Sequence, residues 1–153
     1  MSTIPTRIVD DAIALLNTPA PPAGVPNATR TFTFAIDPAM LPTISGYLEE
    51  IDIRDPSQGN GPVTEDDVHF KLECRVMGDE TTAPDVAADP LIRHVVSRLA
   101  GQEKGVQAGM LYRTILFNGV KYEYQQSDHA YCLATVRFIA RSQHKTGDLE
   151  TWA

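Results

Sequence analysis

The sequence predicts an α+β fold, an antiparallel or mixed β-sheet of about five to six strands with two main helices packed on it. Three patterns support this fold class. Residues 67–77 alternate apolar and polar side chains, as a strand with one buried face does. Residues 4–16 repeat apolar side chains at the spacing of an amphipathic helix. Residues 115–141 are rich in apolar and β-branched residues around the turn-forming pair Asn118-Gly119.

The first helix, residues 4–16, is expected to end near Asn17. Residues 18–26 follow, and their prolines lack a backbone N–H and fix φ, so this segment is expected to be a semi-rigid connector on the surface. Residues 31–36 alternate with phenylalanine and isoleucine on one side. This pattern predicts a half-buried strand.

Residues 41–48 predict another strand, entered through Pro42, which is tolerated at a sheet edge or at a strand's first position. The composition of residues 55–62 is that of a flexible loop. The clearest strand is residues 67–77. Its core side is expected to hold Val68, Phe70, Leu72, Cys74 and Val76.

The second helix is expected to follow a loop at residues 78–88. Asp89 is a suitable N-cap, and Pro90 is suited to the first helical position because its missing N–H would be unpaired there anyway. Gly101 is the expected C′ residue. These signals predict a helix of about three turns.

The last third predicts strands near residues 110–117, 120–125 and 131–140, the first two joined as a hairpin at Asn118-Gly119. Both faces of the last strand are rich in apolar residues. The second face is therefore expected either to be covered by a helix or to meet another subunit. Residues 142–153 are expected to be a flexible C-terminal tail.

At 153 residues, the chain has the length of a single domain, residues 1–153, and can bury a sizeable core. It has no apolar run long enough to cross a bilayer. The N-terminal residues lack a signal-peptide pattern, so a cytoplasmic origin and no membrane partner are expected. Cys74 and Cys132 are expected to be buried reduced thiols, and a disulfide between neighbouring strands remains an alternative.

The formal net charge is −7, and it is unevenly distributed. Residues 49–89 contain 12 acidic and 3 basic side chains, whereas residues 90–145 contain 8 basic and 3 acidic ones. An acidic chain is unsuited to binding duplex DNA through its phosphates. Solvated loops explain any single charge, but the asymmetry also suits a subunit that meets copies of itself head to tail.

No catalytic, cofactor-binding or metal site is predicted. The four histidines lack metal-ligand spacing and have no neighbouring Cys-x-x-Cys unit. Asp128, His129 and Cys132 are close in sequence, but a polar turn before a core-facing cysteine explains them better than a thiol nucleophile does. The glycines that begin at Gly101 lack the Gly-Lys-[Ser/Thr] ending of a phosphate loop. We therefore expect the chain not to be an enzyme.

The order of these elements resembles that of the tail terminator (tail completion, minor tail protein U-like) proteins of long-tailed bacteriophages. The most specific pieces are Leu41-Pro-Thr-Ile-Ser-Gly-Tyr-Leu-Glu-Glu50 and the closing Gly119-Val-Lys-Tyr-Glu-Tyr124. The resemblance covers most of the chain, except residues 55–62 and the tail after Arg141.

The resemblance implies a small α+β subunit of the virion, located in the tail-neck region after assembly in the host bacterial cytoplasm. Such subunits form a ring, expected here to be a hexamer, that caps the tail tube and ends its polymerisation. The implied partners are other copies of the chain, the tail tube protein and the head-tail connector protein. DNA is expected to pass through without specific binding, which an acidic lumen would favour.

The charge pattern suggests which residues meet at the subunit boundary. We expect Glu49, Glu50 and Asp52 of one copy to face Arg137 and Arg141 of the next. Two other functions stay open. One is a neck or connector subunit of the same kind of particle, and the other is a small enzyme assembled from scattered residues such as Asp128, His129 and Cys132.

Overall fold

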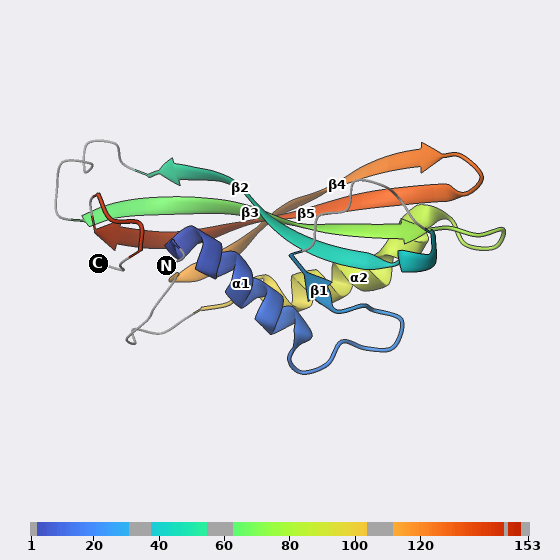
Figure 1. The fold of residues 1–153 in the computed structure, drawn as a ribbon, viewed down its shortest axis with the longest axis horizontal. Helices are drawn as coiled ribbons and strands as arrows, with labels where there is room; N and C mark the ends of the chain where they lie inside the picture. The colour runs from blue at the N-terminus through green and yellow to red at the C-terminus, as the bar shows by residue number, and fades with distance from the viewer. Residues whose placement is uncertain (1–2, 31–37, 55–62, 104–111, 146, 151–153) are drawn as a thin grey trace.

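The structure, a computed structural model, describes residues 3–30, 38–54, 63–103, 112–145 and 147–150. Two helices pack on a five-stranded sheet of order β1-β2-β3-β5-β4 (Figure 1). The elements are α1 (Ile4–Asn17), β1 (Ala28–Thr29), the short 3-10 helix η1 (Pro38–Met40), β2 (Thr43–Ile53), β3 (Val63–Met77), α2 (Pro84–Leu99), β4 (Thr114–Gln126) and β5 (Ala130–Lys145). Strand β1 runs parallel to β2 and the other pairs are antiparallel. The predicted fold class is confirmed.

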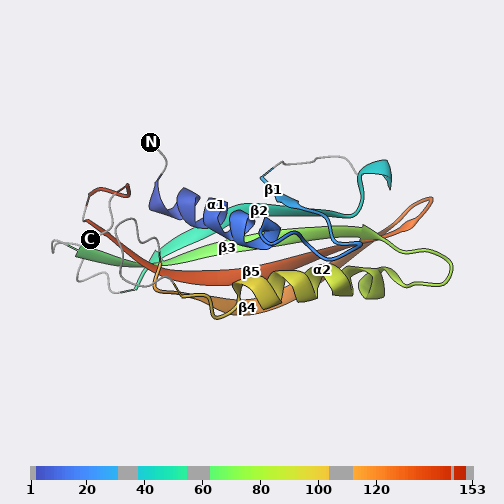
Figure 2. The ribbon, with the colours of Figure 1, turned by 90° about the horizontal axis from the view of Figure 1, so that it is seen from below.

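Both helices lie against the same face of the long, twisted sheet (Figure 2). We call this side the core face. Helix α1 lies nearer β2, and α2 lies nearer β5 and β4. The sheet contributes a continuous apolar set to the core: Ile44, Val68, Phe70, Leu72, Cys74, Val76, Ile115, Cys132, Ala134, Val136, Phe138 and Ala140. This set confirms the predicted core side of residues 67–77, and Phe70 and Phe138 stack at its centre with ring centroids 5.5 Å apart.

Helix α1 follows its sequence pattern closely. The Thr3 side chain caps it by accepting a hydrogen bond from the Thr6 N–H, and Pro5 occupies the first turn. Its apolar stripe is buried against the sheet. No helix within the described segments has the length and apolar character needed to cross a bilayer.

The predicted start of the second helix is wrong. Helix α2 begins at Pro84, with Ala83 as the N-cap, so Pro90 lies inside the helix. Pro90 cannot donate to the carbonyl group of Val86, but both residues are exposed, and water can satisfy that carbonyl. The local signal at Asp89 was therefore overridden at a modest cost. The end of the helix was predicted correctly, because Gly101 follows it with φ +76°.

The predicted hairpin at Asn118-Gly119 is also wrong. Strand β4 continues through these two residues, which together oppose Arg137 of β5 and form a β-bulge. Only Gly119 has a positive φ, of 100°, whereas a type I′ turn needs positive φ at both central residues. The chain turns instead after Gln126, where the Ser127 N–H donates to the His129 carbonyl.

The strand boundaries also differ from those predicted. Strand β2 extends to Ile53, β3 begins at Val63, and β5 extends to Lys145, so the first residues of the expected tail belong to the sheet. Past β5, the carbonyl of Leu149 accepts a hydrogen bond of 2.7 Å from the Ile4 N–H. The predicted strand at residues 31–36 and the predicted loop at residues 55–62 lie outside the described residues.

Candidate interaction surfaces

The sheet face opposite the helices is called the open face here. None of the described helices covers it (Figure 2). The registers of the strands place four groups of side chains on it: Tyr47, Glu49, Glu50 and Asp52 from β2; His69, Lys71, Glu73 and Arg75 from β3; Leu133, Thr135, Arg137, Ile139 and Arg141 from β5; and Leu116, Lys121 and Glu123 from β4. The face is mostly charged, with apolar side chains at Leu133 near the β4–β5 turn and at Leu116 and Ile139 further along the strands.

Glu73 holds two cations of the open face in place. Its side chain is 9% exposed, its Oε1 lies 3.2 Å from the Lys71 Nζ, and its Oε2 accepts a hydrogen bond of 2.7 Å from the Arg75 Nη2. The Glu73 carboxylate therefore contacts both cations, one through each oxygen, and this cluster carries one excess positive charge.

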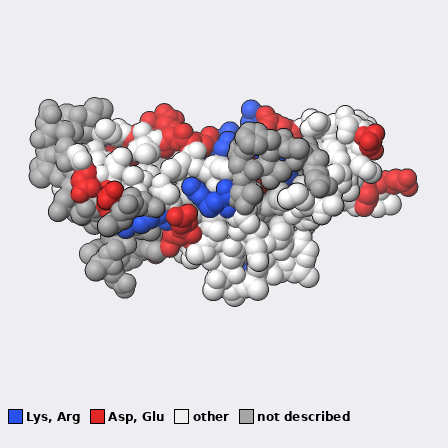
Figure 3. Space-filling model, viewed as in Figure 1, with Lys and Arg blue, Asp and Glu red and all other residues white. Residues whose placement is uncertain are grey.

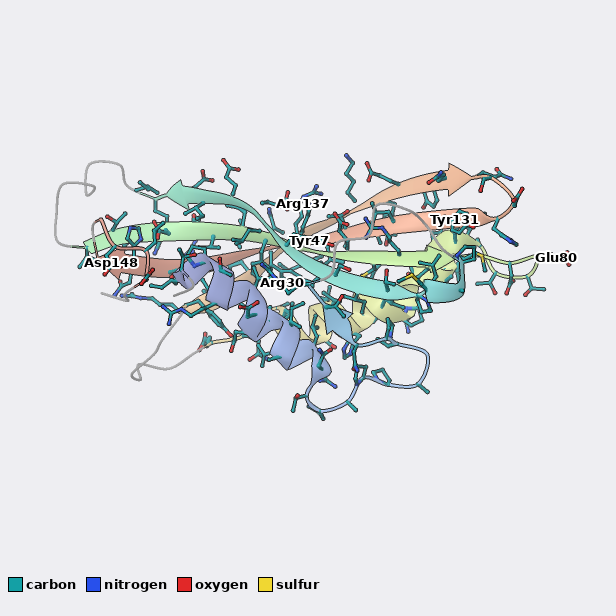
Figure 4. All side chains as sticks on the ribbon, viewed as in Figure 1. Arg30, Tyr47, Glu80, Tyr131, Arg137 and Asp148 are labelled. Atoms are coloured by element: carbon teal, nitrogen blue, oxygen red, sulfur yellow. The ribbon has the colours of Figure 1, made fainter. Side chains whose placement is uncertain are left out.

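Two of the predicted boundary residues meet inside one chain. The Arg137 Nε lies 3.2 Å from the Glu49 Oε1, reaching across β3 from β5 to β2. The register shift between Leu48 and Glu50 makes Glu49 an extra residue in the β2–β3 ladder, and its side chain points to the open face. Arg137 and Tyr47 lie near the middle of the sheet (Figure 4). Arg137 and Glu49 were predicted to lie on different subunits, whereas here they pair within one chain.

The other three predicted boundary residues are also on the open face. The Asp52 Oδ2 lies 3.0 Å from the His69 Nε2, and Glu50 is exposed beside His69 in the ladder. Arg141 is exposed and stands opposite Asp67 in the register. The role of these residues at a subunit boundary stays a prediction, because the structure holds one copy.

The acidic and basic halves of the sequence are neighbours in the sheet, since acidic β2 pairs with β3, and β3 pairs with basic β5. Acidic side chains gather along the outer half of β2 (Figure 3). Arg54 reduces the negative charge there, with its Nε 3.3 Å from the Asp67 Oδ1 and its Nη1 3.7 Å from the Glu65 Oε2. Part of the asymmetry seen in the sequence is therefore neutralised within the chain.

Two strand edges expose large apolar side chains, a feature that the sequence reasoning missed. On β4, the exposed fractions of Phe117, Tyr122 and Tyr124 are 46%, 41% and 60%. On the outer half of β2, those of Ile51 and Ile53 are 40% and 46%. The sequence shows apolar residues alternating with polar ones along these strands. This alternation is the same for a central strand and for an edge strand, so it does not predict exposure at an edge.

The candidate trio for an enzyme does not form a usable nucleophilic site. Asp128 and His129 are exposed in the β4–β5 turn, whereas Cys132 is 2% exposed and belongs to the core face. Burial, followed by the nearby Asp85 charge, raises the pKa of the Cys132 thiol. A thiol with a raised pKa is less often the reactive thiolate. Both Cys132 and Cys74 are free thiols, as predicted.

One partly buried and one buried polar pair lie beside the apolar residues of the core. The Tyr112 hydroxyl donates a hydrogen bond of 2.8 Å to the Asp11 Oδ2. The His144 Nδ1 contacts the Asp66 Oδ2, and these residues are 8% and 2% exposed. Burial raises the pKa of Asp66 despite the opposing effects of His144 and Arg54. Within the described segments, no group of three or more His, Cys, Asp or Glu residues is placed to hold a metal ion.

A shallow hollow of about 600 Å³ lies between the proline-rich connector and α2. Two of its polar side chains are already engaged with the backbone, since the His94 Nε2 lies 2.8 Å from the Leu16 carbonyl oxygen and the Arg98 Nη1 donates to the Pro19 carbonyl. Among the residues that the structure describes, no carboxylate lines the hollow. Its described walls hold the connector against the helix and bring no acid–base pair together.

No protein-family model matches the sequence, and no curated protein matches it. Among solved structures, the chain is similar in fold to a chain described as "Virion of native gene transfer agent (GTA) particle". The match covers 91% of this chain and 90% of that chain, with a TM-score of 0.49 and 15% sequence identity. A likeness at this distance assigns neither a family nor a role to this chain.

Proposed function

We propose that the chain is a structural subunit of a phage-like virion that forms a ring, expected to contain six copies, on the end of a tail tube. In this role it ends tube polymerisation and offers a surface to the head-tail connector. The sequence resemblance to tail terminators supports the proposal, and the α+β fold is of the class that this resemblance implies. The subunit would act by fitting against other proteins rather than by transforming a substrate.

The observation that carries the proposal is the open face. An antiparallel sheet can leave one face to water, and that face is then usually polar along its whole length. Here the neighbouring side chains Leu116 and Ile139 place apolar surface on the face, and Leu116 is 38% exposed. Such a face is expected to be covered by a helix or by another subunit. Both described helices lie on the other side, which favours the partner.

The decisive test is tube capping. Purified chain is added to polymerising tail tube protein of the same particle, and tube length and ends are followed by negative-stain electron microscopy. A terminator keeps tubes short and adds a ring of density at one end, and its mass in solution or on the tube gives the number of copies. Tubes that elongate equally with and without the chain would contradict the proposal.

Charge reversal tests the predicted boundary. Changing both Arg137 and Arg141 to Glu is expected to weaken ring formation at low salt, because the acidic residues of β2 would meet like charges. Arg137 also pairs with Glu49 within the chain, so Arg141→Glu alone is the matched variant: it reverses a boundary charge, leaves that pair intact and should also weaken the ring. Unchanged rings in the double reversal would remove this boundary.

Two alternatives are separable from the terminator role. A neck subunit would bind capsids and leave tube elongation unaffected. An enzyme built on the β4–β5 turn would lose function in Asp128→Asn and His129→Ala, which are exposed and should fold normally. Retained assembly and particle function in those variants would exclude that enzyme.

Tight binding of the ring to duplex DNA at physiological salt would contradict a lumen that lets DNA pass.

A further inference from the structure

Considering only the described residues, the sheet has two unpaired edge segments, one on each side. On β4, residues 101–103 occupy the outer side near Thr114 and Ile115, where the Ile115 N–H donates to the Gln102 carbonyl. Beyond that point, no described residue pairs with the outer side of β4. On β2, β1 occupies only the outer side at Ile44 and Ser45. Among the described residues, residues 50–53 have no partner on that side.

The backbone groups of these segments point outward at the residues that also expose apolar side chains. In β4, the Ser127 N–H donates to the His129 carbonyl, so the alternation of an antiparallel ladder directs the N–H and C=O of Glu123 toward β5. The N–H and C=O of Tyr122 and Tyr124 then face the free edge. Their side chains are on the core face, since Tyr122 is opposite Ala134 and Tyr124 is opposite Cys132.

The same phase holds on β2. The Arg54 N–H donates to the Glu65 carbonyl, so the alternation directs the backbone groups of Asp52 toward β3 and those of Ile51 and Ile53 toward the free edge. Ile51 is opposite Val68, so its side chain is also on the core face. Both edges therefore combine outward hydrogen-bonding groups with exposed apolar side chains on one face.

Strand direction makes the two edges compatible. Strands β2, β3, β5 and β4 alternate in direction, so β4 of one copy runs antiparallel to β2 of a second copy placed beside it in the same orientation. In such a pair the outward-facing residues of both strands bond to each other, and directly opposed side chains share a face. In this arrangement the residues whose backbone groups face the join are also the residues whose apolar side chains lie on the same face in both copies.

We propose that the free edge of β4, at residues 120–126, pairs with the free edge of β2, at residues 50–53, in a second copy of this chain. This inference rests on the proposed homo-oligomer and deepens it, because it names the contact. The join is heterologous, with different surfaces on the two sides, so repetition closes a ring or grows a filament. It hides two apolar edges that would otherwise invite aggregation.

Across the sheet Tyr122 is level with Ile44, so the second copy is shifted along the strands by the seven residues between Ile44 and Ile51. One register consistent with this phase and shift places Ile51 opposite Tyr122 and Asp52 opposite Lys121. The second pair brings opposite charges together. Its backbone groups point away from the join, so it is a non-hydrogen-bonded pair, in which side chains come closest. Glu50 then lies opposite Glu123, a like-charge pair that offsets part of the attraction between Asp52 and Lys121. Two β2 edges facing each other would oppose acidic residues with no basic residue among residues 50–53, which disfavours that pairing more strongly.

Disulfide trapping tests the contact. Two single variants, Asp52→Cys and Lys121→Cys, are mixed, oxidised gently and run on a non-reducing gel. Both positions are exposed, whereas the native thiols of Cys74 and Cys132 are buried. We expect a disulfide dimer in the mixture and none in either variant alone. The chain carrying both changes should give a ladder of covalent oligomers that ends at the number of subunits in the ring.

The outcomes separate this inference from the proposed function. Oligomers that form without the mixed disulfide, or a disulfide between two Lys121→Cys chains, overturn the β4–β2 contact and leave the ring proposal standing. A chain that remains monomeric at high concentration and when mixed with tail tubes overturns both the β4–β2 contact and the ring proposal.

A backbone test complements the trapping. Tyr122→Pro removes the tyrosine ring and the outward N–H without removing a hydrogen bond to β5. Tyr122→Thr also removes the tyrosine ring but keeps the N–H. If the edges pair, sedimentation velocity should show weaker self-association for the proline variant than for the threonine variant, with similar circular dichroism for both. Equal self-association of the two folded variants would overturn the inference.

Discussion

Gly46 of β2 lies beneath α1, and enlarging its side chain is expected to destabilise the fold measurably. A Cβ added at this position would lie 2.9 Å from the Ile13 Cδ1 and 3.2 Å from the Leu72 Cδ1. Favourable carbon contacts lie at about 3.5 to 4.0 Å. In Gly46→Ala, both side chains must therefore give way, or the helix must rise from the sheet.

The magnitude follows from two opposing effects. Overpacking a filled core costs roughly 1 to 3 kcal/mol. Replacing glycine by alanine at a compatible backbone conformation regains about 0.4 to 1 kcal/mol, because the unfolded chain loses freedom. We therefore expect Gly46→Ala to lower the free energy of unfolding by about 1 kcal/mol, which corresponds to a fall of roughly 2 to 4 °C in Tm for a chain of this size.

A double-mutant cycle with Ile13 assigns the loss to this contact. Ile13→Val removes the Cδ1 atom that meets the new Cβ, and it costs about 0.5 to 1.5 kcal/mol by itself. If the clash is the cause, Gly46→Ala should cost less in the Ile13→Val background, with a coupling of at least roughly 0.5 kcal/mol. Urea unfolding followed by circular dichroism measures all four proteins. A stabilised Gly46→Ala variant, or strictly additive effects, would refute the packing argument.

Three further predictions concern the buried polar groups and thiols. Tyr112→Phe leaves Asp11 without its hydroxyl donor and is expected to lower the free energy of unfolding by about 1 to 2 kcal/mol in urea titrations; a neutral change would contradict the bond. Burial raises the pKa of the Cys74 thiol to about 12, so a thiol reagent at pH 8 should label it only after denaturation, and fast labelling of the native protein would show that the site is open. The folded-state pKa of Asp66 is raised above its ordinary value of 3.8, so the folded state binds this proton more tightly than the unfolded state. Its contribution to stability is present below pH 3.8 and is lost as the pH rises through the raised pKa; the stability of the wild type relative to Asp66→Asn should fall over that window, and a constant difference would argue against it.

Local sequence patterns were sufficient where an element's own residues determine its environment. Helix α1 has a threonine cap, an early proline and an apolar stripe, and it forms where those signals place it. In β3, strict alternation identified the buried face because a half-buried strand has period two. Gly46 belongs to the motif that begins at Leu41. The structure gives a physical reason for a glycine at this position, since α1 packs directly on it.

Local signals failed where a long-range partner offered more. Asn118-Gly119 favours a tight turn, but turning there would remove the second half of β4 from the edge of β5, a strand of 16 residues. The ladder kept both halves and absorbed the extra residue as a bulge. Helix α2 begins at Pro84 and continues through Asp89 and Pro90, because the Val86 carbonyl that Pro90 leaves unpaired is exposed to solvent.

Residue patterns alone were enough to predict the α+β class, the core face of β3 and the concentration of acidic residues around β2. Which strands lie at the edges was decided only by the tertiary structure, and with it the exposure of Tyr122, Tyr124, Ile51 and Ile53. The pairing of Glu49 with Arg137 inside one chain was likewise a tertiary outcome. The physical reason is that periodicity reports which side of a strand faces the core, whereas strand order depends on contacts between residues far apart in the chain.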